Sequence, residues 1–422
     1  MGGVIINREA IKKVCKGNIC YLYNKEKKIH LFVSTEVLEY IDYYKSNNIS
    51  IRDFLYKFED INDRKYIKKV LDKMNIIGYF EQLKNDSEEK EMKNIDNIYF
   101  LLTKKCNLKC IHCSTSCVPE EKEILSIDQA KTIINNIKKL GIEKIVFTGG
   151  EPMLHSDFFE IVEYAKLKLK NVQFILSTNG TLINKINISF LIEKFDIIEI
   201  SLDGIDENSC DSIRGKGVFE KVIASIKLLQ KYNFYNITLS TVVGENQEAY
   251  IEKFYKLNEK LKTKPLIRAL EPTGRALDNR NIFYEEKTLL PLSIPDIYKE
   301  SSSKSRDISS CSCSAYERII LIDHEGYAYP CPSLYEGNFY IANFLDDNFS
   351  EIELMRILNI KRKKFQKILD FKGTICETCD INIFCWNCPA HFLKAKENNQ
   401  INTWCKKMNK NINQIVWRQI GS

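Results

Sequence analysis

Three cysteines lie within eight residues in the first third of the chain. Cys106, Cys110 and Cys113 form the pattern Cys-x3-Cys-x2-Cys. Thiolates at this spacing can bind three irons of a [4Fe–4S] cube, which leaves the fourth iron open to an outside ligand. A zinc site with Cys117 or His112 as the fourth ligand is the alternative, but zinc sites favour paired Cys-x2-Cys units. The pattern predicts an iron–sulfur site with one exchangeable position.

A glycine pair follows one predicted strand later. Gly149 and Gly150, with Glu151 after them, come directly behind the apolar stretch 144–148. Two adjacent glycines let backbone groups approach a ligand closely, and their carbonyls can accept from a cationic amino group. Glycine pairs after strands are common in themselves. Because the pair comes only one predicted strand after the cysteines, it indicates a second part of the same ligand site.

Strand and helix patterns alternate from residue 98 onward and must position both motifs. A capping box of Ser126 and Gln129 begins a helix that ends at Gly141. Apolar strands are expected at 98–103, 144–148, 172–177, 197–203, 237–243 and 266–270. These strand–helix units predict an α/β fold, in which a parallel sheet curves into a partial, TIM-like (β/α)6 barrel. Such sheets carry their chemistry at the carboxyl ends of the strands.

A smaller part is expected on each side of the barrel. Residues 1–95 predict a module with a hairpin at 19–23 and 29–33, three amphipathic helices and a charged linker. A Ser-rich boundary at 301–310 precedes a cysteine-rich part whose core is too small to be stable without metal. The predicted domains are therefore 1–95, 96–290 and 300–422.

The composition excludes several classes of protein. The 422-residue chain has a net charge of +6 without a basic stripe, and no run of 18 apolar residues, so neither nucleic-acid binding nor a membrane span is expected. The first residues do not form a signal-peptide pattern, which makes the cytoplasm the expected location. In a reducing cytosol, clustered cysteines are expected to bind metal. The outlying Cys15 and Cys20 are expected to be ordinary half-buried residues.

These motifs resemble those of the radical S-adenosylmethionine superfamily over about residues 98–280, including the post-barrel segment 271–276. The resemblance implies that the open iron chelates S-adenosylmethionine, and that one electron cleaves it to a 5′-deoxyadenosyl radical. It implies cofactor contacts for Gly149, Gly150, Glu151, Ser177, Asn179, Ser201 and Arg214. For Ser177 and Asn179 the alternative is turn chemistry, and for Arg214 it is a solvated surface charge. Beyond the cluster cysteines, no catalytic side chain can be named.

The C-terminal cysteines resemble the SPASM extension, named for peptide and sulfatase maturation enzymes, which carries two auxiliary [4Fe–4S] clusters. The resemblance covers about residues 305–410, and eight cysteines match in order. It assigns Cys311, Cys313, Cys331 and Cys388 to the first cluster, and Cys376, Cys379, Cys385 and Cys405 to the second. The tight opening pair and the short gap before Cys388 depart from the family pattern and leave the first ligand set open. A zinc ribbon on Cys376, Cys379, Cys385 and Cys388 is the alternative, although its central gap is short.

The first module resembles the winged-helix-like precursor-peptide recognition element of peptide-modifying enzymes. In that family a leader peptide adds a strand to the edge of the sheet, and main-chain hydrogen bonds supply the affinity. The alternative is a module that only stabilises or oligomerises the enzyme.

Together the three parts resemble a maturase of ribosomally made peptides, of the sactisynthase or ranthipeptide type. The resemblance implies a Cys-rich precursor, a thioether between a cysteine sulfur and carbon, three [4Fe–4S] clusters, and an electron donor such as flavodoxin or ferredoxin. The enzymatic rivals are a carbon–carbon crosslink, epimerisation, or formylglycine formation in a sulfatase. A rival from another class is a non-catalytic iron–sulfur scaffold that binds peptide, although such a scaffold gains nothing from an open iron.

Overall fold

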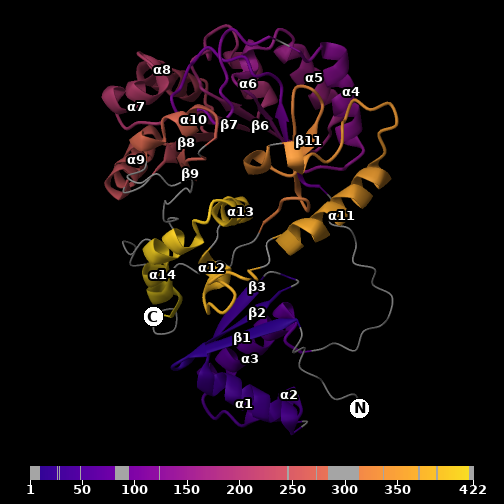
Figure 1. The fold of residues 1–422 in the computed structure, drawn as a ribbon, viewed down its shortest axis with the longest axis vertical. Helices are drawn as coiled ribbons and strands as arrows, with labels where there is room; N and C mark the ends of the chain where they lie inside the picture. Colours follow the sequence, from indigo (N-terminus) through magenta and orange to yellow (C-terminus); the bar gives the residue numbers. More distant parts are fainter. Residues whose placement is uncertain are drawn as a thin grey trace. The chain divides into compact units, whose positions relative to one another are not determined.

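The computed structural model describes most of the chain in two compact units. It covers residues 10–80, 95–283 and 313–417, apart from residues 26, 28, 48, 123, 245, 246, 272, 336, 369, 370, 386 and 387. Cys311 lies outside the described residues. One unit, the barrel unit, comprises Met92–Ser293 and Ser314–Asp370. The other, the N–C unit, comprises Met1–Glu91, Ile294–Cys313 and Phe371–Ser422. Figure 1 labels the elements of both.

The barrel unit is built on one sheet whose central strands run parallel in chain order. These strands are β4 (Asn97–Leu101), β5 (Lys144–Thr148), β6 (Gln173–Thr178), β7 (Ile197–Ser201), β8 (Ile237–Val243) and β9 (Lys264–Ala269). Every pairing between neighbours in this series is parallel. The predicted parallel sheet of an α/β fold is therefore confirmed. Two unpredicted strands extend it: β10 (Ile319–Ile322) pairs parallel with β4, and β11 (Ala328–Tyr329) pairs antiparallel with β10.

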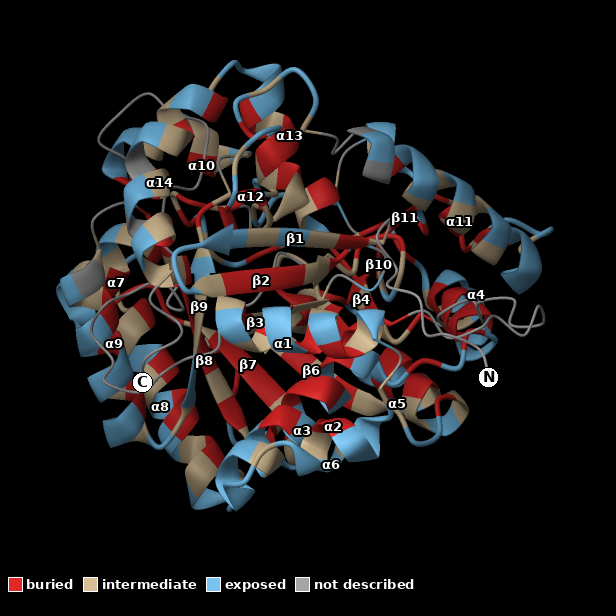
Figure 2. Ribbon diagram, turned by 90° about the horizontal axis from the view of Figure 1, so that it is seen from below, coloured by how far each residue is buried: buried red, intermediate tan, exposed pale blue. Residues whose placement is uncertain are grey.

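Helices connect the strands of this sheet. They are α4 (Ile127–Lys138), α5 (Phe158–Lys168), α6 (Ile188–Lys194), α7 (Glu207–Arg214), α8 (Val218–Lys231), α9 (Glu248–Leu261) and α10 (Arg275–Asp278), with α11 (Glu351–Ile368) after β11. The expected capping box begins α4: Gln129 N donates to Ser126 Oγ, and Ser126 N donates to the Gln129 side chain. Figure 2 shows buried residues along the strands and exposed residues on the outer faces of the helices.

The two faces of the sheet differ in chemistry. Phe147 of β5 lies in a ring cluster, 5.6 Å from Phe174 and 5.9 Å from Phe195 between ring centroids. Phe195 in turn stacks on Phe158 of α5, so helices cover this apolar face. Ser177 and Glu199, paired across β6 and β7, alternate with these residues and lie on the other face, inside the curved sheet. The inner face is therefore the one that carries polar side chains.

The N–C unit begins with a three-stranded antiparallel sheet and three helices. The strands β1 (Ile11–Lys16), β2 (Ile19–Asn24) and β3 (Ile29–Ser34) pair in that order. The helices are α1 (Thr35–Ser46), α2 (Ile51–Tyr56) and α3 (Ile61–Ile77), and their N-caps are Ser34, Ser50 and Asp60. The expected hairpin and three helices are present, with β1 as an added strand. Leu38 and Met74 belong to the apolar cluster that packs the helices against the sheet.

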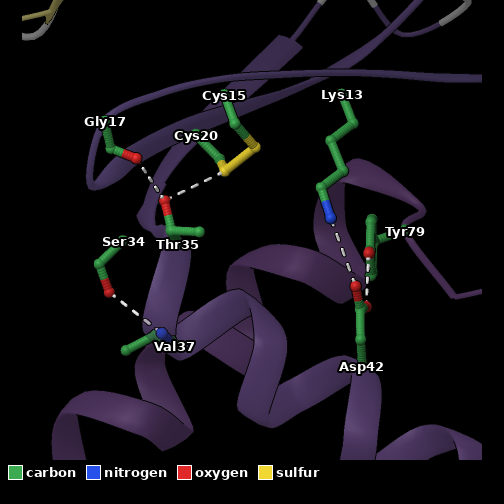
Figure 3. The surroundings of a disulfide bond; sticks show 9 residues. All are labelled: Lys13, Cys15, Gly17, Cys20, Ser34, Thr35, Val37, Asp42 and Tyr79. Carbon is green, nitrogen blue, oxygen red and sulfur yellow. Dashed lines mark hydrogen bonds and ion pairs between the residues drawn. A yellow bond between two sulfur atoms is a disulfide. The ribbon is translucent and has the colours of Figure 1, made fainter.

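The two cysteines of this module form a disulfide. Cys15 in β1 and Cys20 in β2 are bonded, with their Cα atoms 4.0 Å apart, and Figure 3 shows the bond beside Thr35. The short turn at Gly17 places the two cysteines directly opposite one another in the register of the strands. The expectation of two ordinary half-buried residues is wrong because it considers each residue alone and not its partner across the hairpin.

The cysteine-rich residues after 313 are divided between the units. The strands β10 and β11 and helix α11 belong to the barrel unit. The helices α12 (Asn382–Cys385), α13 (Pro389–Glu397) and α14 (Ile401–Trp417) belong to the N–C unit. The division into functional domains at 1–95, 96–290 and 300–422 stays a prediction. Within the described ranges, no helix has the length and apolar character needed to cross a membrane.

Candidate functional site

The three-cysteine pattern lies on the loop that follows β4. Cys106 and Cys110 are buried, and Cys113 is half-buried. The N–H of Cys106 donates to Val118 O at 3.1 Å, and the N–H of Cys113 donates to Cys110 O at 3.3 Å. Backbone bonds therefore close the loop on itself and keep the three cysteines in one compact segment.

Side chains from the end of the barrel hold this loop from outside. Arg275, at the start of α10, donates from Nε to Cys110 O at 2.9 Å and from a terminal nitrogen to Cys117 O at 2.8 Å. Its backbone N–H donates to Cys113 O at 3.0 Å. Asn279 adds a bond from Nδ2 to Ile111 O at 3.0 Å. The sequence offers Arg275 only as part of a family motif, and the structure shows that this side chain binds the cysteine loop.

The electrostatics of the loop favour a bound cation. Burial raises the pKa of Cys106 to about 11 and also raises the pKa of Cys110. The pKa of Cys113 is lowered instead, by a hydrogen bond from the Cys117 thiol and a further one from Thr115. Neighbouring buried thiolates are costly unless a metal compensates their charge. The donor set of three sulfurs therefore fits a metal cluster.

The two alternative fourth ligands of a zinc site are placed differently. The Nε2 atom of His112 lies 2.7 Å from Asp203 Oδ2, so this nitrogen is committed to a carboxylate. Cys117 is buried, with its sulfur 3.0 Å from Thr115 Oγ, and it hydrogen-bonds with Cys113. The Nδ1 atom of His112 is buried and has no hydrogen-bond partner among the described residues, so metal analysis has to address both Cys117 and His112.

The glycine pair packs against the start of the cysteine loop. Gly150 N donates to Thr103 O at 2.7 Å, and Glu151 N donates to Lys105 O at 2.9 Å. A Cβ atom on Gly149 would lie 2.4 Å from Thr103 O, and one on Gly150 would lie 2.4 Å from Lys105 O. Glycine is required here because backbone meets backbone. The predicted contact of these glycines with S-adenosylmethionine stays a prediction.

Glu151 and Asn179 connect the ends of β5 and β6 to the same loop. The buried Glu151 carboxylate accepts from Thr178 Oγ and from Asn179 N, both at 2.8 Å. Burial nevertheless raises the pKa of Glu151 to about 7. The Asn179 side chain donates to Asn107 Oδ1 at 2.9 Å and lies 3.9 Å from Cys106 Sγ. Two predicted site residues are thus brought to the cysteines, and Thr178 is a partner that sequence reasoning missed.

Arg214 is buried and paired with a carboxylate. Its Nε donates to Asp203 Oδ2 at 2.6 Å, and the same oxygen meets His112. Burial by itself raises the pKa of Asp203, but Arg214 and His112 outweigh burial and hold that pKa well below its usual range. The burial of Arg214 excludes a solvated surface charge. Its predicted contact with the cofactor carboxylate stays a prediction, and Asp203 and His112 are partners that the sequence did not reveal.

The inner face of the sheet carries a second polar group. Glu199 of β7 accepts from Arg268 of β9, and Ser177 Oγ lies 3.5 Å from the same carboxylate oxygen. Tyr99 of β4 interacts electrostatically with both members of this ion pair. Ser201 ends β7 on the same face and is half-buried. Sequence reasoning missed Glu199 and Arg268; charged residues inside otherwise apolar strands were the available signal.

A second cysteine site lies in the N–C unit. One cavity is lined by Cys376, Cys379, Cys385 and Cys405, together with Ile375, Asn382, Trp404, Met408 and Asn409. The Asn409 side chain lies 3.9 Å from Cys379 Sγ and donates to it. Burial raises the pKa of Cys405, and the nearby Cys379 raises it further. The chain thus brings together the four cysteines grouped by the cluster prediction, with Cys405 on the cavity wall where the zinc-ribbon alternative requires Cys388.

The other predicted auxiliary ligand set is not assembled within either unit. Cys311 lies outside the described residues. Cys313 and Cys388 belong to the N–C unit, and Cys331 belongs to the barrel unit. In the barrel unit, Cys331 interacts electrostatically with Tyr99 of the inner face. This ligand set stays a prediction.

Comparisons with known proteins agree with this geometry. The profile of the radical SAM superfamily matches residues 100–257. The mycofactocin maturase MftC of Mycolicibacterium smegmatis is 28% identical over 262 residues, which are 58% of this chain and 66% of that protein, so the match spans just under two thirds of its length. The subtilosin biosynthesis protein AlbA of Bacillus subtilis is 26% identical over 339 residues, or 75% of this chain and 72% of AlbA.

Solved structures show the same fold. Streptococcus suis SuiB, bound to S-adenosylmethionine, superposes with a TM-score of 0.53 at 15% identity and covers 92% of this chain and 96% of SuiB. The superfamily match covers the part of the chain that holds the cysteine loop after β4 and most of the parallel strands. Residues 100–257 are therefore similar to the radical SAM superfamily in sequence, and the chain shares the fold of SuiB.

Proposed function

We propose that this enzyme is a maturase of a ribosomally made, Cys-rich precursor peptide, and that it joins a cysteine sulfur to carbon in a thioether. The observation that carries the proposal is the four-cysteine cavity, which the chain builds in addition to the three-cysteine loop. A radical reaction that forms a bond and releases an electron needs a redox centre that accepts this electron. The names of relatives such as MftC and AlbA point to peptide products.

The atoms and electrons of thioether formation balance with these parts. When bound, the cluster and S-adenosylmethionine supply a carbon radical that removes one hydrogen atom from the acceptor residue of the peptide. The peptide thiol would give up its proton to a base and its sulfur would bond to the acceptor carbon. An auxiliary [4Fe–4S] cluster held by Cys376, Cys379, Cys385 and Cys405 would take up the one electron released. The peptide therefore loses two hydrogens per link.

The residues of the barrel have distinct parts in this scheme. Arg275 and Asn279 hold the cysteine loop in place. Glu151 and the glycine pair follow β5, and Arg214 ends α7 and binds Asp203, which follows β7; these are the proposed contacts of the cofactor's methionine moiety. The inner face, with Glu199 and Arg268, is the surface left for the acceptor residue of the peptide.

The N-terminal sheet is the proposed docking site of the leader peptide. In the order β1-β2-β3, both β1 and β3 are edge strands within the described part of this sheet. An extended peptide that pairs with such an edge gains main-chain hydrogen bonds without a preformed pocket. An electron donor such as flavodoxin or ferredoxin completes the set of proposed partners.

Mass spectrometry of the product tests the proposal. Anaerobically reconstituted enzyme, S-adenosylmethionine and dithionite are incubated with a short Cys-rich peptide encoded beside the gene, and the product is then alkylated. A thioether predicts a loss of two hydrogens per link and one thiol per link that no longer reacts. The same mass loss with all thiols still reactive would show a carbon–carbon crosslink, and an unchanged mass would refute the thioether. Cys106→Ala is the inactive control, and about twelve irons per chain are expected from three clusters.

A further inference from the structure

The N-terminal sheet and the loop of the four-cysteine cavity are in direct contact within the N–C unit. The Tyr21 hydroxyl of β2 donates to Asp380 O, next to Cys379. The Tyr21 ring meets Phe384 of α12 edge to face, with centroids 5.2 Å apart. Burial, together with Asp380 and Cys379, raises the pKa of Tyr21 above its usual range, so the hydroxyl stays a donor. The module therefore contacts the backbone that carries the cysteine ligands.

Lys12 of β1 brings a positive charge to the same loop. Its Nζ donates to Asn382 Oδ1 at 3.0 Å and to Cys379 O at 3.5 Å. Asn382 is buried, and its Nδ2 donates to Cys376 O at 2.9 Å. Lys12 is thus linked to two of the four cavity cysteines, directly to Cys379 and through Asn382 to Cys376.

The neighbouring lysine has a different partner. Lys13 Nζ lies 3.5 Å from Asp42 Oδ2 of α1, and Figure 3 shows this ion pair beside Tyr79. Successive side chains of a strand point to opposite faces of the sheet, which accounts for the difference. Lys12 is half-buried against the cavity loop, and Lys13 is exposed. The two lysines form a matched pair for experiment.

We propose that Lys12 is a positioning residue for the second auxiliary cluster, and that its ammonium group raises the reduction potential of that cluster. The inference rests on the proposed function, since it requires a [4Fe–4S] cluster on the four cavity cysteines. Reduction adds negative charge to a cluster, and a cation held nearby stabilises the reduced form. The N-terminal module thereby sets how readily this cluster accepts an electron.

An EPR-monitored redox titration of the reconstituted full-length protein, without peptide, tests this role. The signal of the second auxiliary cluster is identified as the one missing from Cys376→Ala. Lys12→Gln is expected to shift the midpoint potential of that signal to more negative values, because the charge is lost while an amide donor remains. Lys12→Arg keeps the charge and is expected to stay near the wild-type potential. Lys13→Gln, which removes the same charge from the other face, is also expected to leave the potential unchanged.

The possible outcomes distinguish an effect of the Lys12 charge on the cluster from a purely structural role of this side chain. An unshifted potential in Lys12→Gln with full iron content would overturn the inference, as would an equal shift in Lys13→Gln. If Lys12→Gln loses about four irons, retention of those irons in Lys12→Arg supports the role of the charge, and their loss in both variants refutes it. A wild-type protein without the Cys376-dependent signal contradicts the proposed cluster itself, which is a different failure.

Discussion

The two cysteine sites are held in opposite ways. At the barrel loop, three side chains bind a short run of cysteines from outside: Asn179 directly after β6, Arg275 at the start of α10 and Asn279 directly after it. At the cavity, ligands lie on small elements such as the four-residue α12 (Asn382–Cys385), and apolar side chains such as Trp404 and Met408 complete the wall. The first site is held by side chains from the ends of barrel elements, and the second is built from α12, α14 and the loop before them, to which Lys12 and Tyr21 of the N-terminal sheet donate.

The difference follows from what each site must do. A scaffold that fixes three sulfurs by itself can leave one iron open, because exchange of the outside ligand does not disturb the protein. A site that takes four ligands from the chain offers no open position and suits electron transfer and support of the fold. Loss of metal should therefore abolish chemistry at the first site and structure at the second.

Removing one ligand from each site gives the largest expected effect. Cys106→Ala is expected to abolish the formation of 5′-deoxyadenosine, because the loop then lacks one of its three sulfurs, while the barrel stays folded. Cys376→Ala is expected to retain that activity but to lose exchange protection in α12 and α14. Chromatography of the nucleoside and hydrogen–deuterium exchange measure the two effects.

A buried cysteine outside both sites is the control for this pair. Cys210 lies in α7 and is fully buried, so Cys210→Ala tests what removal of a thiol does by itself. The proposed contrast between the two sites would be refuted if Cys376→Ala abolished the formation of 5′-deoxyadenosine as completely as Cys106→Ala does. The contrast would also be refuted if Cys106→Ala unfolded the barrel.

The next largest effect is expected at the buried charges beside the barrel loop. Asp203→Ala leaves Arg214 and His112 without their shared carboxylate, and breaking a buried pair in this way costs about 3–5 kcal/mol. Native-state hydrogen exchange of the β7 and β8 amides measures the loss. Asp206→Ala, three residues on, removes the exposed N-cap of α7 and is expected to cost about 1 kcal/mol. Equal costs in both variants would show that the buried network adds nothing.

Local patterns made most of the barrel predictable from sequence. Apolar runs such as 144–148 and 237–243 mark buried parallel strands, and Ser126 with Gln129 marks the start of α4. The cysteine spacing at 106–113 predicts a site without any structure, because the proposed ligands lie within one loop. These features depend on neighbours in the chain, and the sequence records neighbours directly.

The missed features depend on partners that are distant in the chain. Strand β10 (Ile319–Ile322) is only four residues long and pairs with β4, more than two hundred positions earlier. The contact of Arg275 with Cys110 and that of Lys12 with Asn382 join different ends of their units. Side-chain type does not reveal such pairings, because a lone Arg or Lys in a sequence is most often a surface charge.

A smaller effect is expected when the clamp on the barrel loop is removed. Arg275→Met removes the side-chain donors to the carbonyls of Cys110 and Cys117, although Cys110 O keeps its 3.3 Å bond from Cys113 N. Loss of such a supporting contact typically costs about 10–100-fold in metal affinity or activity. Iron content and the initial rate of 5′-deoxyadenosine formation measure the change. Arg280→Met is the control, because among the described residues its side chain has one hydrogen bond, to Leu277 O at 3.5 Å, and the variant should stay near wild type. A clamp role is excluded if the two variants behave alike.

The smallest expected effect compares one asparagine at each site. Asn179 and Asn409 each donate from Nδ2 to a cysteine sulfur at 3.9 Å, Cys106 in one case and Cys379 in the other. With the proposed clusters bound, each bond would stabilise the more negative, reduced form by about 0.5–1.5 kcal/mol. Asn409→Ala should therefore lower only the potential of the auxiliary cluster and leave cofactor cleavage intact. Asn179→Ala should lower the potential of the barrel cluster and slow cleavage as well, because the same side chain also bonds to Asn107 in the loop. If both variants shifted the reduction potential of the same cluster, the two asparagines would not act on separate sites, and the contrast between the sites would be refuted.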